Sequence, residues 1–401
     1  MAQSPSPAES VYLDHAATTP VADEVLAVMV AALRDGWGNP SSNHGAGRAA
    51  RNAVDSARDT LAAAIGAQAR DMVFLSGGSE ADNLALRGAL DRQSSGRHIV
   101  ISAIEHDAVL KTAESLMELG RAEVTVVPCD ARGVVDPEQF VAAVRDDTVV
   151  ASLMLANNEV GTVQNVARTT ALIRARNPHT LMHTDAVQAL GRIPIDVEAL
   201  GVDLLTITAH KVYGPKGVGA LYVRSGVVIG TQMTGGGQER NRRSGTENVA
   251  GIAAFARAVA LVMSERDVEM ARQASVAERL RQHIVAAIPG IVVTASGADQ
   301  LPNFATFAVP GVPTEVLLTA LDRAGVCASG GSACSSGANF PSHVLLAMGI
   351  EPGLAACALR CTVGRGTTDT DVDVAANAIV RAVTHAREFR GAPGERAGLK
   401  R

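Results

Sequence analysis

The chain has 401 residues, of which 47% are apolar, 19% charged and 3% aromatic, and its formal net charge at pH 7 is −5. This length exceeds the usual limit for a single hydrophobic core, so we expect two closely packed domains. The negative charge argues against nucleic acid or an anionic membrane as a direct partner. Residues 1–10 lack a basic start and an apolar segment, and no stretch approaches the ~18 to 20 apolar residues of a membrane span. We therefore expect a cytoplasmic protein with reduced thiols.

In chain order, short apolar runs alternate with amphipathic segments from residue 21 onward. We expect strands at residues 72–75, 98–102, 123–127, 149–155, 181–184, 203–208 and 218–223. We expect helices at residues 80–90, 108–119, 137–144 and 166–176. This alternation predicts an α/β fold, with a mostly parallel sheet flanked by helices. We assign residues 21–257 to this large domain.

The rest of the chain has a different pattern. We expect helices at residues 246–263, 268–288 and 372–389, and strands at residues 291–294, 304–309 and 358–363. Thr368, with Asp371 three residues later, is a typical start for the last helix. We assign residues 258–401 to a smaller α+β domain and expect residues 1–20 to join it.

The cysteines give no sign of a disulfide framework or of a zinc site. Their number is odd and no two form a CxxC pair. The five are Cys129, Cys327, Cys334, Cys357 and Cys361.

The first segment with chemical meaning is Ser76–Glu80, SGGSE, between a predicted strand and a predicted helix. Its glycines let backbone amides approach an anion, and a helix N-terminus favours phosphate. An ordinary turn capped by Ser79 and Asp82 is the alternative. The segment matches neither GxGxxG nor the GK(S/T) loop, which disfavours a nucleotide and an NAD-dependent oxidoreductase.

The second segment is HTDAVQ, residues 183–188, at the end of another predicted strand. Its carboxylate, Asp185, falls at the edge where open α/β sheets bind ligands. A carboxylate can hold a pyridine nitrogen protonated. A helix-capping role for Asp185 is the alternative.

The third segment follows the predicted strand that ends near residue 208, and it contains Lys211. A lysine that forms a Schiff base must be held rigidly and partly desolvated, so that its amine is neutral and nucleophilic. The chain has four lysines. Lys111 falls in a predicted amphipathic helix, Lys216 follows a Gly-Pro turn, and Lys400 is near the end of the chain. Lys211 is therefore the best candidate, with a surface lysine as the alternative.

The fourth segment is ASGGSACSSG, residues 328–337, which places Cys334 among Gly, Ser and Ala. Such surroundings do not pack a cysteine into a core, and they suit a thiolate that must travel between two sites. Cys129, Cys327, Cys357 and Cys361 lie in or beside apolar, strand-like runs, and we expect them to be structural.

Together these segments resemble the class I cysteine desulfurases, which are fold-type I pyridoxal-phosphate enzymes of the aminotransferase class V family. The likeness runs from Leu13 to beyond Arg365, nearly the whole chain. Its further motifs in this sequence are LDHAATTP (13–20), GNPSS (38–42), EH (105–106), NNEVG (157–161), GGGQE (235–239) and RSGT (243–246).

The resemblance implies three catalytic residues. Lys211 would bind pyridoxal 5'-phosphate covalently, His106 would stack on its ring and move protons, and Cys334 would be the nucleophile. No metal site is implied, except that Cys334 is a candidate for transient iron–sulfur ligation.

The resemblance also implies binding roles. Asp185 would pair with the ring nitrogen, Arg360 and Asn158 would bind the substrate, and Thr246 would reach the phosphate of the other subunit in a homodimer. The implied cofactor-binding set is Gly78, Ser79, His106, Asn158, Asp185, Gln188, Thr208, His210, Lys211 and Thr246.

The implied reaction removes sulfur from L-cysteine and leaves L-alanine and a persulfide on Cys334. A sulfur-acceptor protein would then receive the sulfur, such as an iron–sulfur scaffold or a tRNA-thiolating enzyme. The pathway would be iron–sulfur cluster assembly or the thiolation of tRNA or a cofactor. Alternatives are a C–S lyase, a selenocysteine lyase or an aminotransferase of the same fold, and a catalytically silent binding protein.

Three positions depart from the commonest family pattern. Ser79 stands where Thr is frequent and Thr208 where Ser is frequent, and both keep a hydroxyl group for the phosphate. Gly330 replaces a hydroxyl residue four positions before Cys334, which predicts a looser loop.

Overall fold

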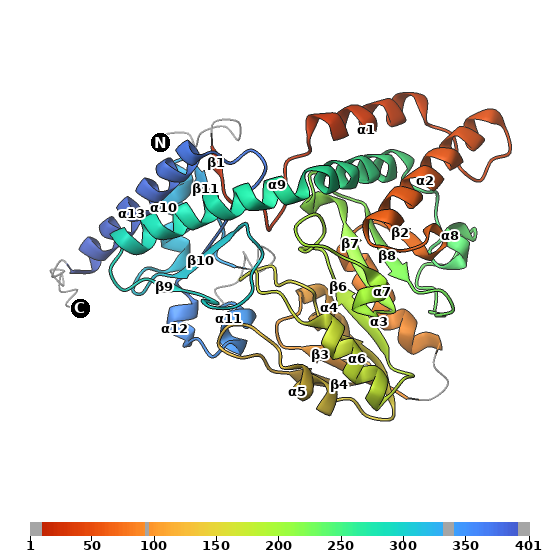
Figure 1. Ribbon diagram of the computed structural model, residues 1–401, viewed down its shortest axis with the longest axis horizontal. Coiled ribbons are helices and arrows are strands. Elements are labelled where there is room, and N and C mark those ends of the chain that lie inside the picture. Colours follow the sequence, from red (N-terminus) through yellow and green to blue (C-terminus); the bar gives the residue numbers. More distant parts are fainter. Residues whose placement is uncertain (1–9, 93–95, 332–340, 392–401) are drawn as a thin grey trace, which may run out of the picture.

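The computed structural model describes residues 10–92, 96–331 and 341–391 (Figure 1). A large mixed sheet with its helices forms one end of the molecule, and a smaller sheet with its helices forms the other. The long helix α9 (Val249–Ala287) runs along both ends and joins them.

The large sheet has the strand order β2-β8-β7-β6-β5-β3-β4. Strand β8 is antiparallel to both of its neighbours, and the remaining pairs are parallel, which confirms the predicted α/β fold. Most of these strands are buried along their whole length, because helices cover both faces and most of the strands are rich in apolar residues. The strands are β2 (Met72–Leu75), β3 (His98–Ser102), β4 (Glu123–Val127), β5 (Thr148–Ser152), β6 (Leu181–Asp185), β7 (Leu204–Thr208) and β8 (Gly219–Val223).

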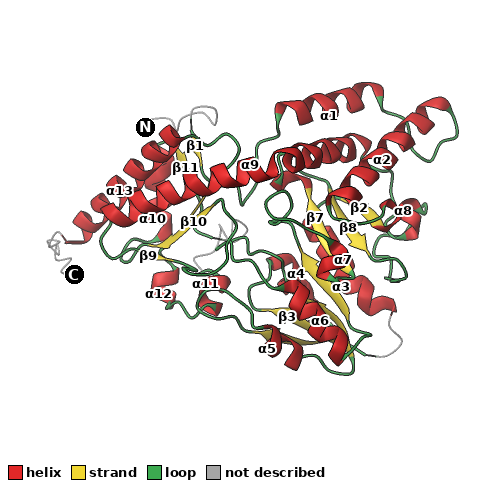
Figure 2. Cartoon of the chain, viewed as in Figure 1, coloured by secondary structure: helices red, strands yellow, loops and turns green. Residues whose placement is uncertain are grey.

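Helices surround this sheet, as Figure 2 shows in red around the yellow strands. The first two helices pack on the N-terminal half of α9, and the third packs against β7 and β8. Side chains cap several N-termini: His106, Asp136 and Asn165 each accept a backbone N–H in the first turn of their helix. The helices are α1 (Asp23–Asp35), α2 (Gly45–Ala64), α3 (Gly78–Arg92), α4 (Asp107–Glu118), α5 (Pro137–Ala142), α6 (Val166–Arg176), α7 (Val197–Leu200) and α8 (Gln238–Asn241).

The smaller sheet is antiparallel, in the order β12-β10-β9. A separate parallel pair, β1 with β11, brings the N-terminal segment to this end of the molecule, where Leu13 is fully buried with Phe307 and Leu359. The elements are β1 (Val11–Tyr12), β9 (Val292–Val293), β10 (Phe304–Ala308), β11 (Val326–Cys327), β12 (Ala358–Thr362), α10 (Thr314–Arg323), α11 (His343–Ala347), α12 (Pro352–Ala355) and α13 (Asp369–Gly391).

One prediction about the helices was wrong. The two helices expected at residues 246–263 and 268–288 are the single helix α9, because the polar residues between them include neither Gly nor Pro. The N-terminal part of α9 packs on α1 and α2, and its C-terminal part on α13 and β10. The domain boundary that we propose at residues 257 and 258 therefore falls within one helix. Despite this length, none of the helices in the described ranges has the apolar character that crossing a bilayer requires.

The start of α13 follows the predicted capping pattern. The backbone N–H of Asp371 donates to the Thr368 hydroxyl, and the Asp371 carboxylate accepts from the backbone N–H and the hydroxyl of Thr368. This reciprocal pair satisfies two donors that a helix start otherwise leaves open.

Candidate active site

A cavity of about 190 Å³ lies where β6 and β7 end, at the carboxyl edge of the large sheet. This is the position at which open α/β sheets bind ligands. Residues far apart in the sequence meet here, including the N-terminal segment and β12. Of the predicted site residues, its wall contains Gly78, Ser79, His106, Asn158, Asp185, Gln188, Thr208, His210, Lys211 and Arg360.

One predicted site residue that the structure describes, Thr246, is not part of this wall. Thr246 is exposed, three residues before α9 begins. Cys334 lies outside the described residues, so its role stays a prediction from the sequence.

Lys211 lies in a short 3-10 turn directly after β7, with its side chain facing the cavity. Its amine donates hydrogen bonds to the backbone carbonyls of Ala16 and Ala17. Burial and the nearby cations Arg360 and Arg192 lower its pKa to about 7. A substantial fraction of the amine is therefore neutral near pH 7, as Schiff-base chemistry requires.

Asp185 ends β6 on the wall of the same cavity. Its Oδ1 accepts the backbone N–H of Val187 at 2.8 Å. Burial raises the pKa of this carboxyl group, and His106 and Lys211 act in the opposite direction. A cationic ring bound in the cavity would favour the ionised form further.

One end of the cavity suits a phosphate group. Helix α3 begins at Gly78, so its unpaired backbone amides face the cavity beside Ser79 and Thr208. A Cβ atom at Gly219 would come within 2.7 Å of the Gly77 backbone, so a glycine is needed where β8 lies this close to the turn before α3. Burial is the main cause that lowers the pKa of His210 to about 4, so its ring is neutral at pH 7.

The alternative explanation of this turn, capping by Ser79 and Asp82, is wrong. The side chain that caps the turn is Glu80, which accepts the backbone N–H of Ser76 at 2.6 Å and pairs with Arg243 at 2.9 Å. Asp82 is instead buried, with 1% of its surface exposed.

The other end of the cavity has a fixed cation, Arg360 of β12. One guanidinium nitrogen donates to Asp14 Oδ1 at 2.8 Å and another to the carbonyl of Asn158 at 2.7 Å. Only 3% of Arg360 is exposed, and its Nε has no partner among the described residues. A charged donor held in this way suits a substrate carboxylate.

Arg360 also fixes the chain that leads toward Cys334. Its backbone N–H donates to the Ser329 carbonyl at 2.6 Å, and the Ser329 N–H donates to the Arg360 carbonyl at 3.1 Å. Gly330 comes next, and a Cβ atom there would lie 2.2 Å from a methyl group of Thr314. Close packing on α10 therefore accounts for the glycine at this position.

The four described cysteines fit the structural role expected for them. Burial raises the pKa of Cys361 to about 12 and that of Cys129 to about 11, and it also raises the pKa of Cys327. Cys357 is buried and its thiol donates to the Gly353 carbonyl. Thiols with raised pKa values are poor nucleophiles near neutral pH.

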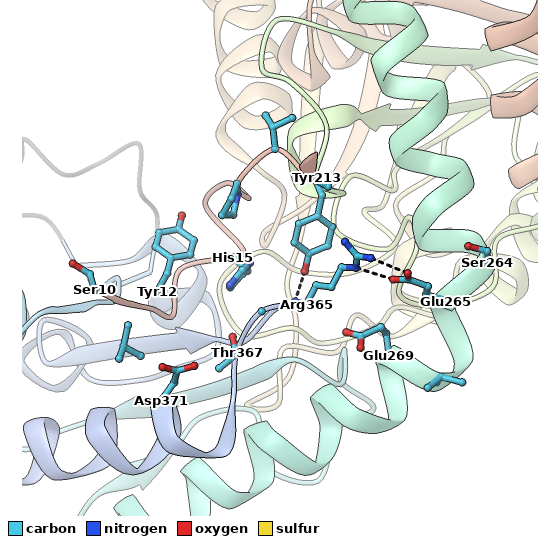
Figure 3. A pocket seen from close by; sticks show the side chains of 16 residues that line it. Ser10, Tyr12, His15, Tyr213, Ser264, Glu265, Glu269, Arg365, Thr367 and Asp371 are labelled. Atoms are coloured by element: carbon cyan, nitrogen blue, oxygen red, sulfur yellow. Dashed lines mark hydrogen bonds and ion pairs between the residues drawn. The ribbon is translucent and has the colours of Figure 1, made fainter. Parts of the chain in front are cut away.

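A wider hollow of about 860 Å³ lies between the N-terminal segment, α9 and the start of α13 (Figure 3). Its cation Arg365 pairs with Glu265 at 2.8 Å, and the Tyr213 hydroxyl accepts the Arg365 backbone N–H at 2.7 Å. None of the ten predicted residues of the smaller cavity lines this hollow. We therefore assign the chemistry to the smaller cavity.

The sequence did not predict several contributors to the site. Asp14 and the carbonyls of Ala16 and Ala17 come from the motif at residues 13–20, which carried the resemblance but no assigned role. Arg192, which donates to the Lys211 carbonyl at 3.1 Å, lay in no motif. Nothing in the sequence around Arg192 indicates that its side chain lies beside Lys211, because only the fold brings the two residues together.

The fold and the cavity together define the class of protein. Residues 11–374 match the family model of aminotransferase class-V, and the chain belongs to this family. It is 42% identical over 378 residues to a protein of Dictyoglomus turgidum named cysteine desulfurase IscS, covering 94% of this chain and 95% of that protein. A protein of Methanosarcina thermophila with the same name is 41% identical, covering 91% and 90%.

Solved structures agree with this family. One described as a NifS-like protein superposes with a TM-score of 0.87 at 35% identity, covering 94% of this chain and 100% of the other. One described as SspA in complex with cysteine has a TM-score of 0.78 at 32% identity, covering 88% and 98%.

Pyridoxal 5'-phosphate is the cofactor of this protein, and the cavity fits it. Lys211 provides an amine that is partly neutral, Asp185 a carboxylate, and the start of α3 a set of free amides. Gln188 Oε1 is buried on the same wall without a hydrogen-bond partner in the described part of the chain. An acceptor left open in this way suits a hydroxyl group on the ring, because an unpaired buried acceptor is unfavourable.

Proposed function

We infer that this chain is a cysteine desulfurase, which removes sulfur from L-cysteine and releases L-alanine. The observation that carries this conclusion is one cavity that combines Lys211, Asp185 and the fixed cation Arg360. The relatives named cysteine desulfurase, which cover nearly the whole chain, support the substrate.

When bound, pyridoxal phosphate would serve as the electron sink for bonds around the substrate α-carbon. Arg360 would hold the substrate carboxylate, and its partners Asp14 and Asn158 would fix the direction of the guanidinium group. Lys211 would accept a proton at Nζ, since its pKa is lowered to about 7.

His106 would be the second group that moves protons. It caps α4, and its Nδ1 accepts the Ala108 backbone N–H at 3.0 Å. In the neutral ring the proton therefore lies on Nε2, which is the atom left to donate to a group in the cavity.

Cys334 would take the sulfur. Its thiolate attacks the substrate sulfur, the carbon–sulfur electron pair stays with the substrate carbon, and protonation of that carbon gives alanine. The product on the enzyme is a Cys334 persulfide. The described residues Ser329 and Gly330 support this role, because their chain segment is paired with Arg360 and leads toward Cys334.

The biological setting belongs to the same proposal. The active unit would be a homodimer, in which the exposed Thr246 reaches the cofactor phosphate of the other subunit. A sulfur-acceptor protein would take the persulfide sulfur in the cytoplasm, for iron–sulfur cluster assembly or for thiolation of tRNA or a cofactor. A C–S lyase that needs no enzyme thiol is the second candidate, since it would use the same Lys211 site.

The decisive experiment compares Cys334→Ser with Cys327→Ser, a matched loss of one thiol. Cys334→Ser should still bind the cofactor and L-cysteine but should form no alanine and no protein persulfide in mass spectra. Cys327→Ser should keep both, because its thiol is half-buried with a raised pKa. Alanine and sulfide at an undiminished rate from Cys334→Ser would instead identify a lyase.

A further inference from the structure

Arg192 is a buried cation beside Lys211 that does not line the candidate active-site cavity. Buried charges are normally paired, because removing a charge from water is unfavourable. Arg192 has no acidic partner among the described residues, and burial lowers the pKa of its guanidinium group. A charge that is kept in the interior without a counter-charge points to a role.

The guanidinium group of Arg192 is bound by two backbone carbonyls. Its Nη1 donates to the Gln188 carbonyl at 2.9 Å, and its Nη2 donates to the Lys211 carbonyl at 3.1 Å. On the cavity side, the Ala16 carbonyl accepts hydrogen bonds from Gln188 Nε2 and from Lys211 Nζ. Lys211 is therefore joined to Gln188 twice, through Arg192 on one side and through the Ala16 carbonyl on the other.

The turn that carries Lys211 has an unusual backbone. Tyr213 has a φ angle of 65°, in the left-handed region that residues with a side chain rarely adopt. Its backbone N–H donates to Thr19 Oγ1 at 2.7 Å, and its hydroxyl accepts the Arg365 backbone N–H at 2.7 Å. Arg192 binds the same turn through the Lys211 carbonyl and is thus one of the anchors that hold it.

Two titratable groups that face the charge of Arg192 are neutral at pH 7. Burial, followed by the charge of Arg192, lowers the pKa of His15 to about 3. Burial raises the pKa of Tyr213, although Arg192 acts in the opposite direction. Neither group can compensate the guanidinium charge.

Two acidic residues, Glu265 and Glu269, line a narrow cavity of about 20 Å³ together with Arg192. Glu265 pairs with Arg365 at 2.8 Å, and Glu269 pairs with Arg272 at 2.9 Å. Both acids also line the wider hollow of Figure 3. Because each already has a cation, Arg192 remains an uncompensated charge next to the Lys211 turn.

The amine of Lys211 faces charges of both signs. Besides burial, Arg360 and Arg192 disfavour a proton on this amine, whereas Asp185 and Asp14 favour it. The two cations differ in position, because Arg360 lines the cavity, where a substrate carboxylate would neutralise it, and Arg192 does not. The other titratable groups on the cavity wall are Asp82, His106 and His210.

We propose that Arg192 is a positioning residue for Lys211. Its guanidinium group fixes the Lys211 backbone, and its charge opposes protonation of the Lys211 amine from a place that the substrate does not reach. When a substrate carboxylate neutralises Arg360, this part of the repulsion remains, so the amine can still give up its proton during the reaction. The role in the reaction rests on the proposed function, whereas the effect on the free amine does not.

The test measures the titration of single lysines in the cofactor-free, full-length chain. Brief acetylation with acetic anhydride at a series of pH values, read by peptide mass spectrometry, gives a rate that follows the neutral fraction of each amine. Each curve is normalised to its plateau at high pH, so that differences in access cancel. Arg192→Gln and Arg192→Met should both raise the midpoint of Lys211 by on the order of one unit, because both remove the charge. The exposed Lys216, read in the same spectra, should not move.

The variants separate the charge from the hydrogen bonds and from hydration. Glutamine keeps a donor for one carbonyl, so it disturbs the turn less than methionine and decides the test if Arg192→Met does not fold. Val262→Ala enlarges the same narrow cavity without removing the charge, and it should leave the midpoint of Lys211 in place. The proposal is overturned if Arg192→Gln leaves the midpoint unchanged, or if Val262→Ala raises it equally.

A second comparison uses chains in which Arg360 is already Met. Arg192→Gln should raise the midpoint of Lys211 again in this background, because the two cations act from different places. No further rise would overturn the claim that Arg192 acts when Arg360 is neutralised. These readings need neither cofactor nor L-cysteine, so failure of this proposal and failure of the proposed function can be told apart.

Discussion

The lowered pKa of Lys211 is the electrostatic property on which cofactor attachment depends most directly. Burial is its first cause and the charge of Arg360 its second. Removing that charge by Arg360→Met should therefore raise the pKa of Lys211. The measurable quantity is the rate at which the cofactor-free protein takes up pyridoxal phosphate, because only the neutral amine reacts.

The magnitude follows from the fraction of neutral amine. With a pKa of about 7, roughly nine-tenths of Lys211 is neutral at pH 8, against roughly 0.3% for a lysine at its ordinary value of 10.5. The wild-type uptake rate at pH 8 should thus be roughly 300-fold above that of an ordinary lysine. Arg360→Met should shift the midpoint of the pH–rate curve upward by on the order of one unit and lower the rate at pH 7.

The assay is stopped-flow absorbance between pH 6 and 10, with each curve normalised to its plateau at high pH. Arg279→Met is the matched control, since Arg279 pairs with Asp373 on α13, away from the cavity. The reasoning is refuted if the wild-type midpoint lies near pH 10. It is also refuted if Arg360→Met lowers the midpoint, or if Arg279→Met moves it equally.

Two further predictions concern stability. The buried Glu239 carboxylate forms a bidentate ion pair with Arg58 at 2.7 and 2.8 Å, and Arg58→Met removes this partner. The variant should lower the free energy of unfolding in urea by about 3–5 kcal/mol. Adding Glu239→Gln to the same chain should recover part of the loss, because it removes the unpaired buried charge. Lys211→Met should stabilise the cofactor-free chain by roughly 2 to 4 kcal/mol. Because the folded pKa of Lys211 lies below the unfolded one, this gain is complete below about pH 7 and disappears as the pH approaches 10.5. Unfolding curves at pH 6 and pH 10 that show the same gain would contradict it.

The sequence predicted the large sheet closely because its strands are short apolar runs between polar turns. Strands β2, β3 and β4 have the predicted bounds. Helices α1 and α2 were not predicted. In α1, Leu26, Val30 and Leu33 are exposed, so its apolar residues do not form one buried face. Helix α2 does have two contrasting faces, with Ala50, Val54, Ala57 and Leu61 buried at helical spacing, so its pattern could have been found in the sequence.

The site could be predicted only where it consists of sequence motifs. Residues at the carboxyl ends of β6 and β7, such as Asp185 and Lys211, fall at the edge where such sheets bind ligands. The contact between Asp14 and Arg360 joins residues 346 positions apart, and nothing in the local pattern of either residue indicates the other. Contacts between charged residues that are distant in the sequence could therefore be found only in the structure.

The same long-range contact explains why the cavity needs both ends of the molecule. Lys211 and Asp185 belong to the large sheet, whereas Arg360 belongs to the small one, and the N-terminal segment joins them through Asp14 and the Ala16 carbonyl. Arg360 lowers the pKa of Lys211 and would also bind the substrate carboxylate. A substrate that neutralises Arg360 would weaken this effect and so favour the protonated amine. Binding of the carboxylate and proton uptake at Lys211 are thereby coupled through one side chain, which is an electrostatic reason to build the site from two sheets.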